Sequence, residues 1–236
     1  MPRIKYEELR PHELEAVIRE APLVYFPVGS MEYHGLHLPF GFDTMHAYEL
    51  CLHAAQQTGG VVLPPTYWGT EGHVDWPGSV LVSNGTFAGI VSDVLARLDR
   101  LGFRLIVICT GHYPDVQGAL IAAVINAYTA THREPTIILL DPFNTHPTDP
   151  RGEHAGIVET SAMLHLRPDL VDMDKLEQPG ALDGISKDCV DATVEYGQRR
   201  FSEVLNEIVK TVNGHMQAIT TFTPSIHGGV TDAETQ

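Results

Sequence analysis

Nearly continuous apolar runs alternate along this chain with segments whose apolar residues recur at helical spacing. The runs at 23–30 and 105–109 are rich in β-branched and aromatic residues, as expected of strands buried on both faces. Two shorter runs, 61–64 and 136–140, have the same character. The helical periodicity predicts helices over residues 11–20, 44–58, 86–101, 116–132 and 191–214. Strands that alternate with helices predict right-handed crossovers and a mostly parallel sheet.

The pattern predicts an α/β fold, a mostly parallel sheet flanked by helices in a single domain over residues 1–236. With 236 residues, of which 43% are apolar and 19% charged, the chain can bury a full core. No repeat or linker divides it. The polar tail from about 225 to 236 is expected to fray or to serve in assembly.

Charge and cysteine usage narrow the classes of partner. A formal net charge of −15 argues against nucleic acid, because binding its backbone requires Lys and Arg. The first residues are charged, and no apolar run approaches the roughly 20 residues that span a bilayer. The three cysteines are scattered, which favours reduced thiols. We therefore expect a cytoplasmic protein that acts on a small molecule, with no membrane contact.

Carboxylates and imidazoles gather directly after the first predicted strand. Glu32, His34 and His37 follow the run at 23–30, and Asp43 comes shortly after them. Polar groups at the carboxyl end of a strand in an α/β protein face a ligand crevice. Mixed oxygen and nitrogen donors suit Zn, Mn or Fe better than Ca or Cu(I). At this point a metal site and a solvated polar loop both explain the cluster.

Two further clusters extend this pattern. His112 and Tyr113 directly follow the run at 105–109, so they are expected at the same sheet edge as the first cluster. His154 and Glu159 lie in a stretch of small residues, and Glu159 would turn inward if a helix begins there. The alternative is a helix start whose acidic residues only complement the helix dipole.

Taken in order, these motifs resemble the creatininase family of metal-dependent amidohydrolases. The likeness extends from Pro27 to about Asp174. It is carried by the run Pro27–Pro39, Asp43, Gly72-His73 with Trp76–Ser79, Gly111-His112, and His154–Gly156 with Glu159–Ser161. The resemblance implies a creatininase-like three-layer sandwich.

The resemblance also implies a site that holds one or two divalent ions, Zn, Mn or Fe. By similarity, Glu32 and His112 bind one ion, His34 binds the other, and Asp43 bridges both. Such a site activates a water molecule and polarises a substrate carbonyl. In creatininase itself a Glu ligand lies two residues after the last histidine of this set, where the present chain has Pro114. Glu159 is the best replacement, with Asp115 behind it.

Catalytic and substrate-binding candidates follow from the same likeness. His154 resembles the family's proton shuttle, and Glu153 is expected to orient it. Ser79 stands at a substrate-contacting position, and His73 and Tyr113 are the other substrate-binding candidates. His73, like His37, equally fits a structural place, because a ring nitrogen must still find a hydrogen-bond partner.

Substrate specificity is expected to differ from that of creatininase. The segment 148–152 contains no aromatic residue where creatininase covers its substrate with tryptophans. Arg151 in this segment suggests an anionic or polyhydroxylated ligand, although an exposed arginine often binds nothing specific.

Three functions remain open from the sequence. The first is hydrolysis of a cyclic amide or formamide by metal-activated water. The second is the opening of an oxidised cyclic polyol such as a keto-inositol. The third is a catalytically silent metal-binding subunit of an assembly, against which the pair Glu153 and His154 argues, because a structural metal site needs no acid or base. By resemblance we also expect a homo-oligomer, a hexamer built from dimers.

Overall fold

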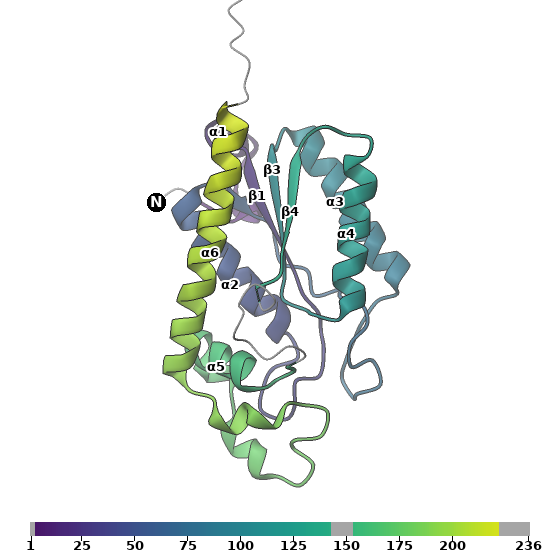
Figure 1. Cartoon of the computed structure of the whole chain (residues 1–236), viewed down its shortest axis with the longest axis vertical. Coiled ribbons are helices and arrows are strands. Elements are labelled where there is room, and N and C mark those ends of the chain that lie inside the picture. Colours follow the sequence, from purple (N-terminus) through teal and green to yellow (C-terminus); the bar gives the residue numbers. More distant parts are fainter. Residues whose placement is uncertain (1–2, 143–152, 222–236) are drawn as a thin grey trace, which may run out of the picture.

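A parallel four-stranded sheet in the order β2-β1-β3-β4 forms the centre of the computed structural model, which describes residues 3–142 and 153–221 (Figure 1). The strands are β1 (Leu23–Val28), β2 (Val61–Val62), β3 (Leu105–Thr110) and β4 (Thr136–Leu140). β1 and β3 pair along their whole length, with Val28 opposite Thr110. The segments that follow these two strands therefore leave the sheet side by side, as predicted from the sequence.

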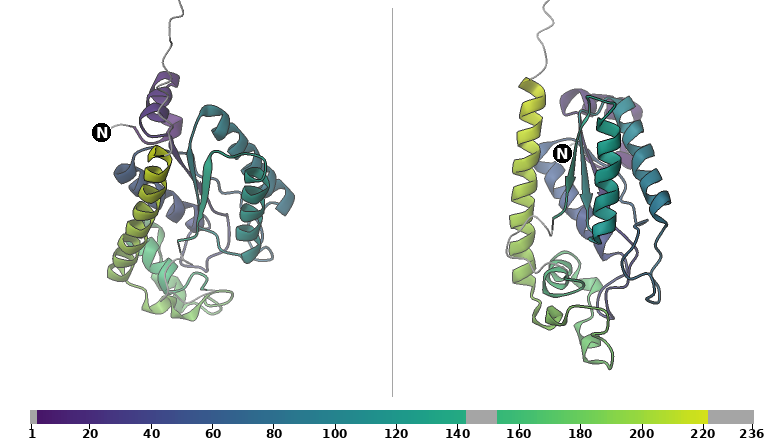
Figure 2. Two further views of the ribbon diagram at one scale, coloured as in Figure 1. Left: turned by 45° about the horizontal axis from the view of Figure 1, so that its top comes forward. Right: turned by 45° about the vertical axis from the view of Figure 1, so that its right-hand side comes forward.

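Within residues 3–142 and 153–221, six α-helices surround the sheet (Figures 1 and 2). They are α1 (Pro11–Glu20), α2 (Phe42–Thr58), α3 (Asn84–Leu101), α4 (Asp115–Thr129), α5 (Ile157–Leu166) and α6 (Val194–Thr221). The same part of the chain also contains short 3-10 helices: η1 (Tyr6–Glu8), η2 (Pro168–Leu170), η3 (Met173–Glu177) and η4 (Lys187–Asp191). In the views of Figures 1 and 2, α2 and α6 cover one face of the sheet and α3 and α4 cover the other. The predicted α/β sandwich is confirmed.

Side chains of β1 alternate between two cores. Leu23 and Tyr25 pack with α2 and α6, whereas Val24 and Phe26 pack with α1, α3 and α4. All four are buried, which explains why the sequence of β1 reads as an unbroken apolar run. A slip of one residue would exchange the two faces, so the alternation fixes the alignment of the strand.

The end of the chain differs most from the prediction. The last helix was expected over 191–214, but it begins at Val194 and continues to Thr221. Thr193 marks its start, because its hydroxyl oxygen accepts a hydrogen bond from the backbone N–H of Tyr196 at 3.1 Å. Residues 187–191 instead form the 3-10 helix η4.

Helix α5 carries Glu159 to the sheet edge. Its residues Ala162 and Met163 pack with Phe42 at the start of α2 and with Leu38. The predicted polar tail at 225–236 and the segment 148–152 with Arg151 lie outside the described residues. Within residues 3–142 and 153–221, no helix combines the length and apolarity needed to cross a membrane.

Candidate metal centre

Five predicted ligand residues from four separate segments meet at the carboxyl edge of the sheet. Each is buried, with an exposed fraction of 1–2%. They come from the segment after β1, the first turn of α2, the segment after β3 and the first turn of α5: Glu32, His34, Asp43, His112 and Glu159. Burial of this many ionisable groups is costly unless they pair with one another or coordinate a metal.

The first group consists of Glu32, Asp43 and His112, whose donor atoms lie within 4.8 Å of one another. His112 Nδ1 is 2.9 Å from Glu32 Oε2 and 2.8 Å from Asp43 Oδ2. Ser30, next to the end of β1, donates its hydroxyl hydrogen to Asp43 Oδ2 at 2.6 Å and so fixes that carboxylate.

The second group consists of His34, Asp43 and Glu159, which meet the same distance limit of 4.8 Å. His34 Nε2 is 2.9 Å from Asp43 Oδ1 and 3.7 Å from Glu159 Oε2. Asp43 therefore belongs to both groups, with one oxygen toward each histidine. Glu159 occupies the place predicted for it, whereas Asp115 is exposed and belongs to neither group among the described residues.

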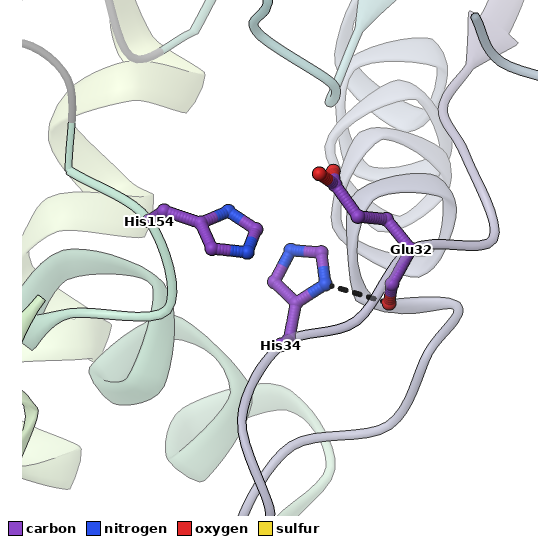
Figure 3. Close-up of side chains that lie close together, drawn as sticks. All are labelled: Glu32, His34 and His154. Atoms are coloured by element: carbon purple, nitrogen blue, oxygen red, sulfur yellow. Dashed lines mark hydrogen bonds between the residues drawn. The ribbon is translucent and has the colours of Figure 1, made fainter. Parts of the chain in front are cut away.

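The hydrogen bonds of the two histidines test whether these residues fit a metal ion. His34 Nδ1 donates to the backbone carbonyl of Glu32 at 3.0 Å, as Figure 3 shows. His112 Nε2 donates to the backbone carbonyl of Thr70 at 3.2 Å. Because a carbonyl only accepts, a neutral ring then carries its lone pair on the opposite nitrogen.

Both lone pairs point at carboxylate oxygens, which repel them unless a cation lies between. His34 Nε2 is buried and makes no well-aligned hydrogen bond with any described residue. The cation can be a proton on each ring or a divalent metal ion. The donors are nitrogen and carboxylate oxygen, the set that Zn and Mn accept, so the residues fit the implied metal.

The pKa values show how strongly the site attracts positive charge. Burial opposes charging of His112, but Asp43 and Glu32 outweigh it and raise its pKa to about 10. The pKa of His34 is raised to about 9 in the same way, chiefly by Asp43. Despite burial, the hydrogen bond and charge of His112 lower the pKa of Glu32 to about 2. Burial raises the pKa of Glu159 well above its usual value.

His154 points toward His34 and Glu32, one member of each ligand group, from the segment that leads into α5 (Figure 3). Its Nε2 donates to the backbone carbonyl of Tyr33 at 2.7 Å, and its ring stacks on His73 at 4.0 Å between centroids. Burial and the charge of His34 lower its pKa to about 4, so the ring is neutral near pH 7. A donor atom of His154 also lies within 4.8 Å of donor atoms of Glu32 and His34.

Glu153 has a contact that the sequence did not suggest. Its Oε1 accepts hydrogen bonds from the backbone N–H groups of Val158 at 2.8 Å and Glu159 at 3.2 Å. These are orphan donors at the start of α5, so Glu153 stabilises the helix that carries Glu159. The hydrogen bond that orients the ring of His154 is the one to Tyr33, and the orienting role predicted for Glu153 stays a prediction.

The substrate-binding candidates surround the ligand groups. His73 approaches the other oxygen of Glu32, with its Nδ1 at 2.8 Å and its backbone N–H at 2.5 Å. Ser79 Oγ accepts a hydrogen bond from the backbone N–H of Tyr33 at 3.0 Å. Burial raises the pKa of Tyr113, which keeps its hydroxyl protonated. His37 Nε2 lies 2.9 Å from Thr160 Oγ1. Contact with substrate stays a prediction for Ser79, His73 and Tyr113.

Sequence reasoning missed the residues that hold the ligands in place. Ser30 binds Asp43, and Thr70 accepts from His112 through its backbone. Gln117 in the first turn of α4 is completely buried beside Thr70. Ser30 could have been found as a polar residue within the run Pro27–Pro39, but a glutamine near a helix start resembles a surface residue.

Comparison with known proteins decides the family. A model described as "Creatinine amidohydrolase", for the family Creatininase, matches residues 7–212. The chain belongs to the creatininase family. As a creatininase-family protein it is a metal-dependent hydrolase, which agrees with the two ligand groups at the sheet edge.

Relatives within the creatininase family have different named substrates. The creatinine amidohydrolase of Pseudomonas putida is 31% identical over 192 residues, 72% of this chain and 74% of that protein. The 3-dehydro-scyllo-inosose hydrolase of Thermotoga maritima is 27% identical over 182 residues, 71% of this chain and 58% of that protein.

Solved creatininase structures share the fold. A crystal structure of creatininase has a TM-score of 0.81 at 23% identity, covering 92% of this chain and 99% of that one. A creatininase variant of Zn-Zn type has a TM-score of 0.79 at 24% identity, covering 89% and 97%. A creatininase structure named for Mn has a TM-score of 0.73 at 25% identity, covering 94% and 99%.

Proposed function

We propose that this protein hydrolyses the carbonyl–nitrogen bond of a cyclic amide or a formamide, with Zn or Mn as its cofactor. One observation carries the proposal: the ring nitrogens His34 Nε2 and His112 Nδ1 converge on the shared carboxylate of Asp43, and the imidazole of His154 lies beside them. A metal site with an adjacent proton carrier suits hydrolysis better than a structural role.

The two ligand groups assign the residues that would hold the ions. Glu32, Asp43 and His112 would hold one, and His34, Asp43 and Glu159 would hold the other. When bound, such ions lower the pKa of water and polarise a carbonyl group. Glu159 supplies the carboxylate that Pro114 cannot. Its Oε2 accepts a hydrogen bond from the backbone N–H of Ala155 at 2.6 Å, which orients this oxygen toward His34.

His154 transfers the proton in this reaction. With Nε2–H donated to Tyr33 and a pKa near 4, its other ring nitrogen is free of a proton at neutral pH. It takes a proton from the attacking water while the new carbon–oxygen bond forms. It then gives that proton to the leaving nitrogen as the carbon–nitrogen bond breaks. His73, stacked on His154 and bound to Glu32, holds the ring in place for both transfers.

A second candidate is the opening of an oxidised cyclic polyol. The inosose hydrolase of Thermotoga maritima supports it, at 27% identity. The same proton transfers through His154 apply, except that the bond broken is carbon–carbon and the proton goes to carbon. A catalytically silent metal-binding subunit is the third candidate, supported only by the metal groups themselves.

Metal analysis and a substrate panel separate the candidates. The purified protein, supplemented with zinc or manganese, should contain one or two ions per chain, and no bound ion would contradict both enzymatic proposals. Lactams, formamides and keto-inositols are then assayed by release of product. Turnover of amides supports the first proposal, turnover of keto-inositols alone supports the second, and a metal-loaded protein inactive on all three supports the silent subunit.

We also propose a small-molecule substrate, a homo-oligomer and a cytoplasmic location. The net charge of −15 supports a partner other than nucleic acid. The cysteines Cys51, Cys109 and Cys189 are free and buried, which suits a reducing compartment. A hexamer rests on the family resemblance, and light scattering coupled to size-exclusion chromatography tests it, because a monomer would contradict it.

A further inference from the structure

Gln117 is a completely buried polar side chain that the proposed chemistry does not use. It lies in the first turn of α4, directly after the segment that carries His112. A buried amide side chain needs both an acceptor and a donor partner to offset its lost hydration. Its partners therefore show what this residue holds in place.

Both ends of the Gln117 amide bind segments next to the metal centre. Gln117 Oε1 accepts a hydrogen bond from the backbone N–H of Thr70 at 2.9 Å. Gln117 Nε2 donates to the hydroxyl oxygen of Thr110 at 3.3 Å. Thr70 and Thr110 are themselves 1% exposed, so water does not compete for these contacts.

The direction of every hydrogen bond in this group is determined. The backbone N–H of Thr70 can only donate, so it faces the oxygen of the Gln117 amide, and the nitrogen must face Thr110. The Thr110 hydroxyl, which accepts from Gln117, uses its own hydrogen on the backbone carbonyl of His112 at 2.8 Å. The Thr70 carbonyl can only accept, so His112 donates from Nε2 at 3.2 Å.

These four bonds form a closed ring: His112, Thr70, Gln117 and Thr110. One consequence is that the neutral ring of His112 keeps its proton on Nε2, which leaves Nδ1 to face Glu32 and Asp43. A second consequence is that two hydrogen bonds fix the orientation of His112, one to its backbone carbonyl and one from its imidazole. Outer contacts of this kind commonly set the basicity and orientation of a metal-binding histidine.

We propose that Gln117 is a positioning residue for the metal centre, which acts through Thr70 and Thr110 to fix the proton and the orientation of His112. The inference rests on the proposed metal centre, because it assigns Nδ1 of His112 as the ligand atom. The inference goes beyond that proposal because it makes zinc affinity depend on Gln117, a side chain that would contact neither the ion nor the substrate.

The test compares zinc affinity in the wild-type protein and in Gln117→Met, which keeps the length of the side chain and removes both hydrogen bonds. We expect the affinity to fall about tenfold, the lower end of the range for outer contacts. Thr110→Val, which removes the hydroxyl and keeps the shape, should give a similar loss. Because both act through one ring, the double variant should lose little more than either single variant.

Ile121→Ala is the matched control. Ile121 lies one turn further along α4, is completely buried and belongs to the apolar core against the sheet. This variant should lose stability but keep wild-type zinc affinity. An equal loss of affinity in Ile121→Ala would show that Gln117 matters only for packing, and would overturn the inference.

A spectroscopic measurement separates positioning from stability. In zinc-loaded protein labelled with ¹⁵N-histidine, wild type should show a protected Nε2–H signal from His112. Gln117→Met should lose that protection, and Ile121→Ala should keep it. Wild-type affinity in Gln117→Met and Thr110→Val overturns this inference alone, whereas failure of wild type to bind zinc overturns the proposed metal centre itself.

Discussion

At the scale of single residues, the chemistry depends on which ring nitrogen of each histidine is committed to the backbone. His34 donates from Nδ1 to Glu32, His112 donates from Nε2 to Thr70, and His154 donates from Nε2 to Tyr33. In each case a carbonyl oxygen leaves the opposite nitrogen available. The sequence identified these three histidines through their motifs, but it could not assign their nitrogens, because the carbonyls that select them come from the fold.

Zinc affinity should rise with pH. In the metal-free protein the raised pKa values, about 9 for His34 and about 10 for His112, exceed the ordinary value of about 6.5. The protonated rings therefore stabilise the metal-free fold fully below about pH 6.5, and this contribution is lost as the pH rises through 9 to 10. Zinc must displace these protons.

Competition titrations with a zinc chelator at pH 6.5, 7.5 and 8.5 measure this effect. We expect tighter zinc binding at each step, and calorimetry in buffers of different ionisation enthalpy should detect the released protons. An affinity that does not change over this range would contradict the protonated state of the two rings.

His154→Gln should separate proton transfer from metal binding. The variant removes the group that carries the proton, so turnover should fall by about 10²–10⁴-fold. Metal content should stay at the wild-type level, because Glu32, His34, Asp43, His112 and Glu159 are unchanged. If the variant loses an ion instead, His154 is a ligand, an arrangement that its distance to Glu32 and His34 also permits.

At the scale of elements, the site depends on how closely α5 approaches α6. A side-chain carbon added at Gly197 of α6 would clash with the backbone carbonyl oxygen of Ser161 in α5. The absence of a side chain at this position therefore sets the distance between the two helices. The sequence could not show this, since a glycine inside a helical pattern only lowers the expected helix propensity.

Gly197→Ala should destabilise the protein and disturb Glu159, which α5 carries. Forcing an extra carbon into a packed contact costs about 1–3 kcal/mol. Gly214→Ala is the control on the same helix, because the added carbon meets nothing within 4 Å. It should stabilise the helix by up to about 1 kcal/mol. Urea unfolding of both variants measures the difference, and equal stabilities would contradict the close contact.

At the scale of the whole molecule, the sequence predicted the fold well and the supports of the site poorly. The apolar runs identified each strand that the described residues form, because buried parallel strands have a distinctive composition. The sequence left open whether α5 turns Glu159 inward. It did not predict the 3-10 helices between Pro168 and Asp191, because packing on the rest of the chain stabilises them. Gln117 and Thr70 were missed because their roles exist only once distant segments meet.

Zinc should stabilise the entire fold, because the ligand groups join segments from Glu32 to Glu159. Free zinc at 1,000 times its dissociation constant adds about 4.1 kcal/mol to the free energy of unfolding. For a chain of this size that corresponds to a rise in Tm on the order of 10 °C. Thermal unfolding with zinc and with a chelator measures the rise.

Asp43→Asn is the control for this measurement. The amide keeps the shape of the side chain but removes the charge that both ligand groups share. Its Tm should respond little to zinc. A rise equal to that of wild type would show that zinc stabilises the protein from some other place.

The pairing of β1 with β3 also limits how this protein can be re-engineered. Val28 stands opposite Thr110, and each strand delivers its ligands within a few residues of that point. Adding one residue between Val28 and Glu32 would displace the carboxylate by about 3.3 Å, more than its 2.9 Å separation from His112. Libraries aimed at new substrates should therefore vary side chains around residues 74–79 and keep the lengths of the turns that follow β1 and β3 unchanged.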